Sequence, residues 1–448
     1  MRYDCEMKIV LIPIDNRPVC YQLPLFPGKI DKSLEIIVPP FKMLGDLKKQ
    51  ADIEGLFSWL ETIKDADCYV IALDTLIYGG LISSRRCDDS LEILKNRLNH
   101  LKISLKNKKI FAFSSIMRIS NNNINEEEKP YWNKWGKKIF DYSYHFHRYG
   151  ETKTDVPSEI LKDYLETRHR NFEINKQLLK MQKQGFFDTL IFSKDDCAEY
   201  GLNVMESEEL ASLGATVKTG ADEIPLTLLA RAIPVNMKIK PIFTEPDFKS
   251  LISNYEDISI FNCVKSQISL AECEIDENNP DLILVINNFR EKQGEIVMKI
   301  PTEPFSADFK SYNIPYAVAD VRFANGADNA FIKKFLTRDM VNFIGYAGWN
   351  TSANTLGSLI FALKVIFYAR KNGNYDEENH KKWLLTRFLD DWAYQANVRQ
   401  ELNMTDVEEL SEKMQPYENI LAQKFDVNYK LCYSFPWSRL FEVKIDIK

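Results

Sequence analysis

The feature that most constrains this chain is a repeated transition from a short apolar run to adjacent polar residues. Residues 189–194 lead directly into Asp195 and Asp196, and residues 215–221 lead into Asp222 and Glu223 about one helix length later. A run of this kind is typical of a strand buried on both faces, as in a parallel sheet. The carboxyl ends of parallel strands form the edge where α/β proteins bind ligands, so the pattern predicts a site at that edge.

The same transition occurs eight times, mostly with helical segments between the runs. The runs span residues 8–14, 68–73, 109–115, 189–196, 215–223, 281–288, 316–320 and 343–350. Eight strands that alternate with helices predict an α/β fold of the (β/α)8, TIM-like barrel type. An open doubly wound sheet or two α/β lobes would follow if one strand is miscounted.

Length and local patterns suggest how the barrel is elaborated. The chain has 448 residues, more than a typical single domain but compatible with a barrel that carries insertions. Residues 121–185 lack a strand signal and predict a helical insertion, whereas residues 234–279 predict a small α/β insertion. We expect a barrel domain over residues 1–360, followed over residues 361–448 by a helical C-terminal appendage with an extended tail.

The polar residues that follow the strands are the candidate site, because a parallel barrel would gather them at one mouth. The candidate catalytic residues are the paired acids Asp195, Asp196, Asp222 and Glu223. The candidate substrate-binding residues are Asp15, Asn16, Arg17, Asp74, Tyr78, Arg118, Asn287, Asn288, Asp320, Trp349 and Asn350. Burying so many acids and amides is unfavourable unless they bind something. Any single acid could instead be a helix cap or a first-turn acid, which helix N-termini favour.

The residue types at this mouth suggest carbohydrate chemistry. Carboxylates can transfer protons, amides and acids can bind hydroxyl groups, and aromatic rings can pack against a sugar ring. We therefore expect a glycoside hydrolase with a small carbohydrate substrate and no cofactor. Two alternatives stay open: a hydrolase or lyase whose Mg²⁺ or Mn²⁺ is held by Asp15, Asp74, Asp222 and Glu223, and a non-catalytic sugar-binding protein. His145 and His147 would diverge on a helix, so a zinc site there is not expected.

Composition narrows the partners and the compartment. The formal charge of −6 argues against a nucleic-acid partner. The eight cysteines show no CxxC pair and suit free thiols in a reducing cytoplasm. The N-terminus lacks the apolar run of a signal peptide, and we identify no apolar window of 18 residues. We therefore expect a soluble cytoplasmic protein with no membrane partner, whereas its oligomeric state is not readable from the sequence.

Several segments resemble a known family along nearly the whole chain. These segments lie at residues 15–18, 38–46, 73–80, 220–223, 346–357 and 389–395. Together they resemble a bacterial family catalogued as domain of unknown function 4127. This resemblance implies no particular activity.

A second resemblance is local. The strand that ends in Asp195 and Asp196 is similar to that of retaining N-acetylglucosaminidases of the O-GlcNAcase type. The resemblance implies that Asp195 orients a substrate acetamido group and that Asp196 is the acid/base. It would make the protein a retaining N-acetylhexosaminidase-like enzyme acting on small amino-sugar glycosides, with Asn287, Asn288 and residues 349–350 contacting acetamide and hydroxyl groups.

Overall fold

The protein consists of two compact units, each built on its own parallel sheet. The computed structural model describes residues 7–195, 198–307, 310 and 312–448. Unit 1 contains Arg17–Glu35 and Leu226–Lys448, and unit 2 contains Met7–Asn16 and Ile36–Pro225.

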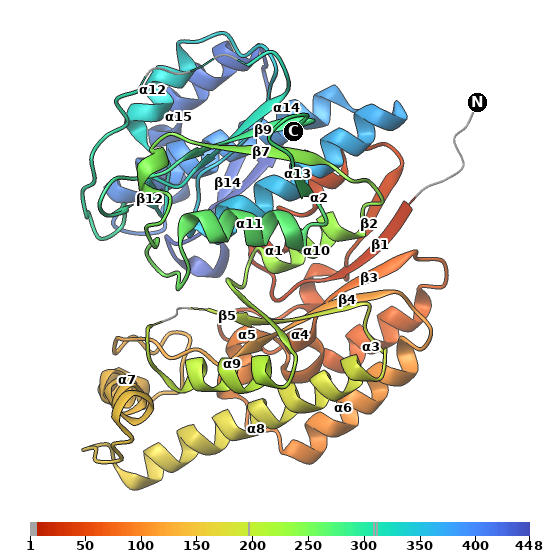
Figure 1. Ribbon diagram of the computed structural model, residues 1–448, viewed down its shortest axis with the longest axis vertical. Helices are drawn as coiled ribbons and strands as arrows, with labels where there is room; N and C mark the ends of the chain where they lie inside the picture. The colour runs from red at the N-terminus through yellow and green to blue at the C-terminus, as the bar shows by residue number, and fades with distance from the viewer. Residues whose placement is uncertain (1–6, 196–197, 308–309, 311) are drawn as a thin grey trace. The chain divides into compact units, whose positions relative to one another are not determined.

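The sheet of unit 2 has the strand order β2-β1-β3-β4-β5-β6 (Figure 1). Its strands are β1 (Met7–Ile12), β2 (Leu34–Ile37), β3 (Cys68–Ala72), β4 (Ile110–Ile116), β5 (Thr189–Lys194) and β6 (Thr216–Thr219). The pairs from β1 through β3, β4 and β5 to β6 are all parallel. Because β3 and β4 are buried along their whole length, their sequences are almost entirely apolar.

Helices follow the strands of unit 2, and α8 and α9 pack on β4 and β5 (Figure 1). The longer helices are α3 (Ile53–Thr62), α6 (Leu91–Ser104), α7 (Trp132–Tyr149), α8 (Ser158–Lys183) and α9 (Leu202–Ser212). Two of them begin at sequence-encoded caps, since Asp52 accepts a hydrogen bond from Gly55 N and Ser90 accepts one from Ile93 N. Helices α7 and α8 lie within residues 121–185, the segment expected to be helical.

Two short helices, α4 (Leu73–Tyr78) and α5 (Leu81–Arg86), follow β3 directly. They are joined by Gly79 and Gly80, whose φ angles of 84° and 129° lie in the region that favours glycine. A Cβ atom on Gly79 would also come within 2.1 Å of Gln50 Cγ. This glycine pair allows the sharp turn that packs α5 against α4.

The sheet of unit 1 has the strand order β13-β11-β9-β7-β8, and every pairing is parallel. Its strands are β7 (Lys238–Phe243), β8 (Glu274–Ile275), β9 (Leu282–Asn287), β11 (Tyr316–Asp320) and β13 (Phe343–Ala347). The helices that accompany it are α10 (Ile224–Ala232), α11 (Ile260–Leu270), α12 (Asn329–Leu336), α13 (Ser352–Asn372), α14 (Glu377–Arg387) and α15 (Val407–Phe425). The short elements include α1 (Pro18–Tyr21), α2 (Leu25–Gly28), β10 (Gly294–Glu295) and β12 (Phe323–Ala324).

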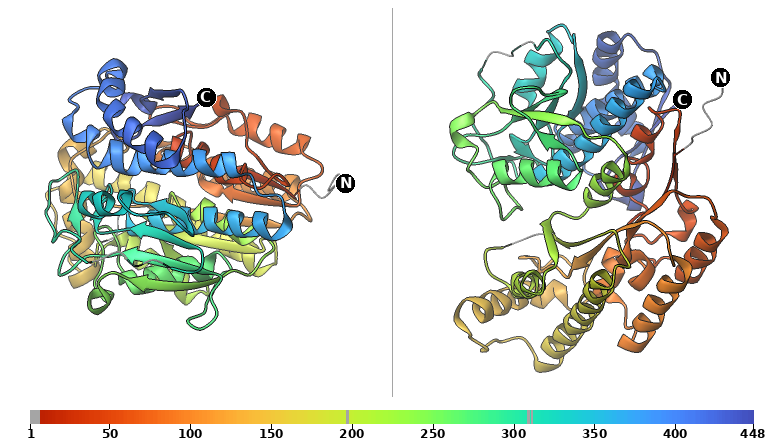
Figure 2. Two further views of the ribbon diagram at one scale, coloured as in Figure 1. Left: turned by 90° about the horizontal axis from the view of Figure 1, so that it is seen from above. Right: turned by 45° about the vertical axis from the view of Figure 1, so that its right-hand side comes forward.

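Helix α13 is the core helix of unit 1 and packs on β11, β13 and α11 (Figure 2). It contains a window of 18 residues apolar enough to span a membrane, so the expectation that no such window exists was wrong. Of that window, 89% is buried inside the protein, as in the core helix of a globular protein. Its apolar character is therefore explained by packing against the sheet.

The C-terminal part of unit 1 is helical up to α15 and ends in an antiparallel pair, β14 (Leu431–Ser434) with β15 (Lys444–Ile447). Between α14 and α15 the chain forms a π-helix, η3 (Phe388–Gln395). The boundary predicted at residue 360 falls inside α13, and both sides of it belong to unit 1.

The structure confirms the α/β class and the parallel pairing of the strands, but it does not show a closed TIM-like barrel. Among the described residues, the eight predicted strands are divided between two open sheets, five in unit 2 and three in unit 1. The segment 234–279, predicted as an insertion, supplies β7 and β8 to the sheet of unit 1. The transition from apolar strand to polar residue looks the same in a barrel and in an open sheet, which explains why the barrel was predicted.

Candidate functional site

Charged side chains gather where the parallel strands of unit 2 end. Asp74 follows β3, Arg118 follows β4, Asp195 follows β5 and Asp222 follows β6. Because these strands run in the same direction, their carboxyl ends lie at one edge of the sheet. The electrostatic neighbours of these residues add three further side chains. We call the set of Asp74, Arg85, Arg118, Glu127, Glu128, Asp195 and Asp222 the unit 2 cluster.

Asp195 is the residue of this cluster best suited to donate a proton. Burial raises the pKa of its carboxyl group, and the neighbouring Asp222 raises it further, whereas Arg118 and Arg85 oppose the shift. Arg118 Nη1 donates a long hydrogen bond of 3.4 Å to Asp195 Oδ2. The Asp195 side chain keeps 27% of its surface exposed, so a ligand can reach it.

Two arginines and two glutamates form the other half of the cluster. Arg118 Nη2 donates to Glu127 Oε2 at 2.8 Å, and Arg118 Nε donates to Glu128 Oε1 at 3.4 Å. Arg85 lies against the same two glutamates, with Nη2 at 3.4 Å from Glu127 Oε2 and Nε at 3.4 Å from Glu128 Oε1. Sequence reasoning missed Arg85, Glu127 and Glu128. Their only sequence signals were the double glycine before α5 and the run of glutamates at residues 126–128.

Asp74, a member of the cluster, and Tyr78 lie one turn apart on α4, and both are buried. Asp74 Oδ2 accepts a hydrogen bond of 2.9 Å from Ser115 N, whereas Oδ1 has no hydrogen-bond partner among the described residues. Burial raises the pKa of Asp74 to about 6. Burial and the nearby Asp74 also raise the pKa of the Tyr78 phenol well above its usual value. Asp74 also sits in the first turn of α4, as the helix-terminus alternative expected.

The other predicted residues of unit 2 are also buried. Asp15 and Asn16 follow β1, and Asn16 N donates to Gly45 O at 3.1 Å. Glu223 is fully buried at the start of α10, and a Cβ atom on Gly220 would come within 1.9 Å of Glu223 Oε1. Gly220 has a φ of 107°, a backbone conformation that favours glycine. Asp196 lies outside the described residues.

The acids of unit 2 do not assemble a metal site in the part of the chain that the structure describes. Within that part, no three His, Cys, Asp or Glu side chains converge closely enough to hold a metal ion. The proposed ligand set of Asp15, Asp74, Asp222 and Glu223 is therefore not gathered around one point. The six described cysteines, Cys20, Cys68, Cys87, Cys263, Cys273 and Cys432, are free thiols.

A second polar cluster lies where the strands of unit 1 end, and it is centred on Asp320. Asp320 accepts hydrogen bonds from Asn287 Nδ2 at 2.8 Å, from the Tyr346 hydroxyl at 3.0 Å and from Asp328 N at 2.8 Å. Arg322 Nε donates to Asn287 Oδ1 at 3.2 Å. Burial, assisted by the charge of Asp328, raises the pKa of Asp320 to about 7. We call these five residues the unit 1 cluster.

Glu245 is hydrogen-bonded to two residues of unit 1, Arg322 and Asn288. Arg322 Nη2 donates to Glu245 Oε1 at 2.9 Å. Asn288 exchanges two hydrogen bonds of 2.9 Å with the backbone of Glu245. Asn287 and Asn288 therefore hold neighbouring strand ends together.

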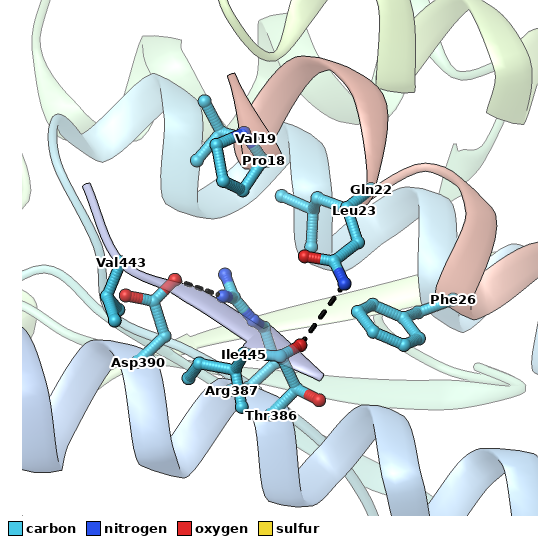
Figure 3. A pocket seen from close by; sticks show the side chains of 10 residues that line it. All are labelled: Pro18, Val19, Gln22, Leu23, Phe26, Thr386, Arg387, Asp390, Val443 and Ile445. Atoms are coloured by element: carbon cyan, nitrogen blue, oxygen red, sulfur yellow. Dashed lines mark hydrogen bonds and ion pairs between the residues drawn. The ribbon is translucent and has the colours of Figure 1, made fainter. Parts of the chain in front are cut away.

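The π-helix η3 brings Asp390 and Asp391 against Arg387. Asp391 Oδ2 accepts a hydrogen bond of 2.7 Å from Gly348 N, and Arg387 Nη2 donates to Asp390 Oδ2 at 2.7 Å. Burial raises the pKa of Asp391 to about 8. Figure 3 shows Arg387 and Asp390 beside a cavity of about 20 Å³, which has room for about one water molecule.

The remaining predicted binding residues of unit 1 make internal contacts. Trp349 Nε1 donates to Ser358 Oγ at 3.0 Å, and Asn350 O accepts from Asn325 N at 2.8 Å. The Arg17 guanidinium lies 5.4 Å from the ring centroid of Trp437. The structure thus brings Asp74, Arg118, Asp195 and Asp222 together in unit 2. It places Asn287, Asn288, Asp320, Trp349, Asn350 and Arg17 in unit 1 instead.

The comparisons with known proteins give a family without an activity. A family model described as protein of unknown function (DUF4127) matches residues 9–446, nearly the whole chain, so the chain belongs to this family. No curated protein matches the chain. The local resemblance of residues 192–196 to N-acetylglucosaminidases finds no support in these comparisons.

Proposed function

We propose that this member of the DUF4127 family is a glycoside hydrolase whose acid–base site is the unit 2 cluster. The observation that carries the proposal is the carboxyl group of Asp195, whose pKa is raised beside a second acid, Asp222. Hydrolysis of a glycosidic bond needs an acid to protonate the leaving oxygen and a second carboxylate to assist attack at the sugar carbon. Asp195 and Asp222, two interacting carboxyl groups at the edge of the sheet, would supply the acid and the second carboxylate.

The two acids take different roles because they cannot ionise independently. Repulsion between neighbouring carboxylates raises the pKa of one member of the pair. We assign the proton donor to Asp195, because burial raises the pKa of its carboxyl group and 27% of its side chain stays exposed to a ligand. Asp222 then acts as the ionised carboxylate. Since Asp196 lies outside the described residues, we give it no role, and we propose no specificity for an acetamido group.

Hydrolysis of a panel of glycosides tests this proposal. Asp195→Asn should slow alkyl glycosides by roughly 10²–10⁴-fold but affect nitrophenyl glycosides much less, because activated leaving groups need little protonation. Asp222→Asn should slow both classes. Asp155→Asn is the matched control, since Asp155 lies in the same unit with 84% of its side chain exposed.

Each other outcome has a defined meaning. Full activity of both the Asp195 and the Asp222 variants would overturn the proposal. Loss of activity on addition of EDTA, restored by Mg²⁺ or Mn²⁺, would favour the metal-dependent hydrolase or lyase. Binding of sugars without turnover would favour a sugar-binding protein.

A further inference from the structure

We infer that the substrate of the unit 2 cluster is a sugar acid, whose carboxylate takes the place of Glu127 between Arg118 and Arg85. This inference rests on the proposed function and deepens it by naming the substrate class. It is carried by the way the two arginines are held and by the difference between their two glutamate partners.

The two guanidinium groups share one carboxylate oxygen. Glu127 Oε2 lies 2.8 Å from Arg118 Nη2 and 3.4 Å from Arg85 Nη2. Arg85 is only 1% exposed, yet its Nη1 atom has no hydrogen-bond partner among the described residues, and its Nε reaches Glu128 Oε1 only at 3.4 Å. A buried guanidinium usually forms paired hydrogen bonds with a carboxylate. Arg85 therefore has unused capacity for a carboxylate that is better placed than Glu127.

Glu127 and Glu128 differ in how firmly they are placed. The Glu128 side chain is 6% exposed and contacts both arginines from inside the protein. The Glu127 side chain is 21% exposed and lies in a segment between β4 and α7 that has no helix or strand. The neighbouring residues from Asn121 to Ile124 are exposed as well. Glu127 is thus the carboxylate that a ligand arriving from solvent can replace.

Charge balance determines which kind of ligand fits. The cluster has five carboxyl groups and two arginines, so an additional anion would be repelled. A ligand carboxylate that replaces the Glu127 carboxylate leaves the number of charges around the arginines unchanged. A doubly charged phosphate would add one negative charge, which makes a carboxylate the better match.

Position relative to Asp195 links this recognition to the proposed reaction. Arg118 contacts both Glu127 and Asp195, so a carboxylate bound in place of Glu127 would lie beside the proton donor. Glu127 is also one of the groups that raise the pKa of Asp195. A substrate carboxylate in that position would keep the same influence and so preserve the proton on Asp195.

Binding of matched sugar probes to the full chain tests the inference. The probes are the methyl glycosides of glucuronic acid, galacturonic acid, glucose and N-acetylglucosamine, together with glucose 6-phosphate. At least one of the two uronides should bind about 10-fold or more tightly than the neutral glycosides, the difference that a charge-assisted hydrogen bond provides. Isothermal titration calorimetry gives the affinities.

Variants separate this contact from general effects on the fold. Glu127→Ala should tighten uronide binding because it removes the competing carboxylate, whereas Glu126→Ala, one residue away on the exposed side of the same segment, should leave it unchanged. Arg118→Met should weaken uronide binding by about 10-fold or more, a larger loss than for the neutral glycosides, which have no carboxylate for Arg118 to bind. Because Glu127→Ala predicts a gain, it remains informative if an arginine variant fails to fold.

The outcomes distinguish this inference from the proposed function. If neither uronide binds better than the neutral glycosides, or if Glu127→Ala does not tighten binding, the inference is overturned. Tightest binding of glucose 6-phosphate would overturn it as well. Hydrolysis of neutral glycosides alone would contradict the inference and keep the glycosidase. Tight binding of a uronide whose glycosides are not hydrolysed would keep the inference and remove the glycosidase.

Discussion

The unit 1 cluster and the unit 2 cluster arise from the same sequence pattern, but their polar groups differ in how completely they are hydrogen-bonded. In unit 1, Asp320 receives three hydrogen bonds of 2.8–3.0 Å and is fully enclosed by the residues that donate them. In unit 2, Asp195 and Glu127 are partly exposed, and Arg85 meets its glutamates only at 3.4 Å. A polar residue at the end of a parallel strand can therefore either hydrogen-bond neighbouring strand ends to each other or contact a ligand.

What distinguishes the two clusters is whether the protein itself supplies every partner. A buried polar group without a partner is unfavourable, and one with all its partners is a stable part of the interior. The unit 1 cluster belongs to the second kind, which argues for a structural role. The unit 2 cluster leaves Asp74 Oδ1 and two nitrogens of Arg85 without hydrogen bonds in the described part of the chain. A site for an external ligand needs polar atoms that still lack a hydrogen-bond partner in the free protein.

The largest expected effect concerns stability. Asp320→Ala would leave Asn287, the Tyr346 hydroxyl and Asp328 N without their acceptor, so it should lower the free energy of unfolding by about 4 kcal/mol. Asp195→Ala should change that free energy by less than about 0.5 kcal/mol, because it also relieves repulsion with Asp222. Urea unfolding followed by circular dichroism measures both values. Equal losses for the two variants would contradict the distinction between the clusters.

A second prediction concerns the pH dependence of unit 1. Asp391 and Asp320 have folded-state pKa values raised to about 8 and about 7 by burial, above the values of unfolded aspartates. Their protonated forms are favoured by folding, so their contribution to stability is present in acid and is lost as the pH rises through these values. We expect unit 1 to lose about 4 kcal/mol between pH 6 and pH 9, about two thirds of it through Asp391.

Hydrogen exchange measured by mass spectrometry can follow this loss in peptides from α13, β11 and β13, after correction for the intrinsic pH dependence of exchange. Asp391→Asn should flatten the dependence above pH 7, because asparagine does not ionise but can still accept the hydrogen bond from Gly348 N. A dependence that persists unchanged in this variant would show that other groups cause it.

The individual elements were predictable from the sequence because their signals are local. The apolar run of residues 68–73 and the polar residue after it correspond to β3 and Asp74, and the run of residues 281–288 corresponds to β9 and Asn288. Parallel pairing was predictable as well, since strands buried on both faces imply it. Which strands share a sheet was not predictable, because no local signal separates the strands of unit 2 from those of unit 1.

The candidate site was predictable only in part for a related reason. Asp195 and Arg118 each end a strand, so the pattern identifies them. The contact between Arg85 and Glu127 joins residues 42 positions apart, neither of which ends a strand. The sequence also cannot tell that Asn287 and Asp320 are bound to each other and not to a ligand, because that depends on how closely β9 and β11 are paired.

The smallest expected effect is the difference in stability between variants of two buried arginines, Arg322 and Arg85. Arg322 is fully buried and donates to Asn287, to Glu245 and to Glu303 O, so Arg322→Met should lower the free energy of unfolding by about 2 kcal/mol or more. Arg85 is just as buried but has only long contacts, and Arg118 remains on both of its glutamates, so Arg85→Met should change that free energy by less than about 1 kcal/mol. Urea unfolding of the two variants side by side gives the difference. If Arg85→Met is as destabilising as Arg322→Met, Arg85 is a structural residue, and its weak contacts cannot be explained by a role in binding.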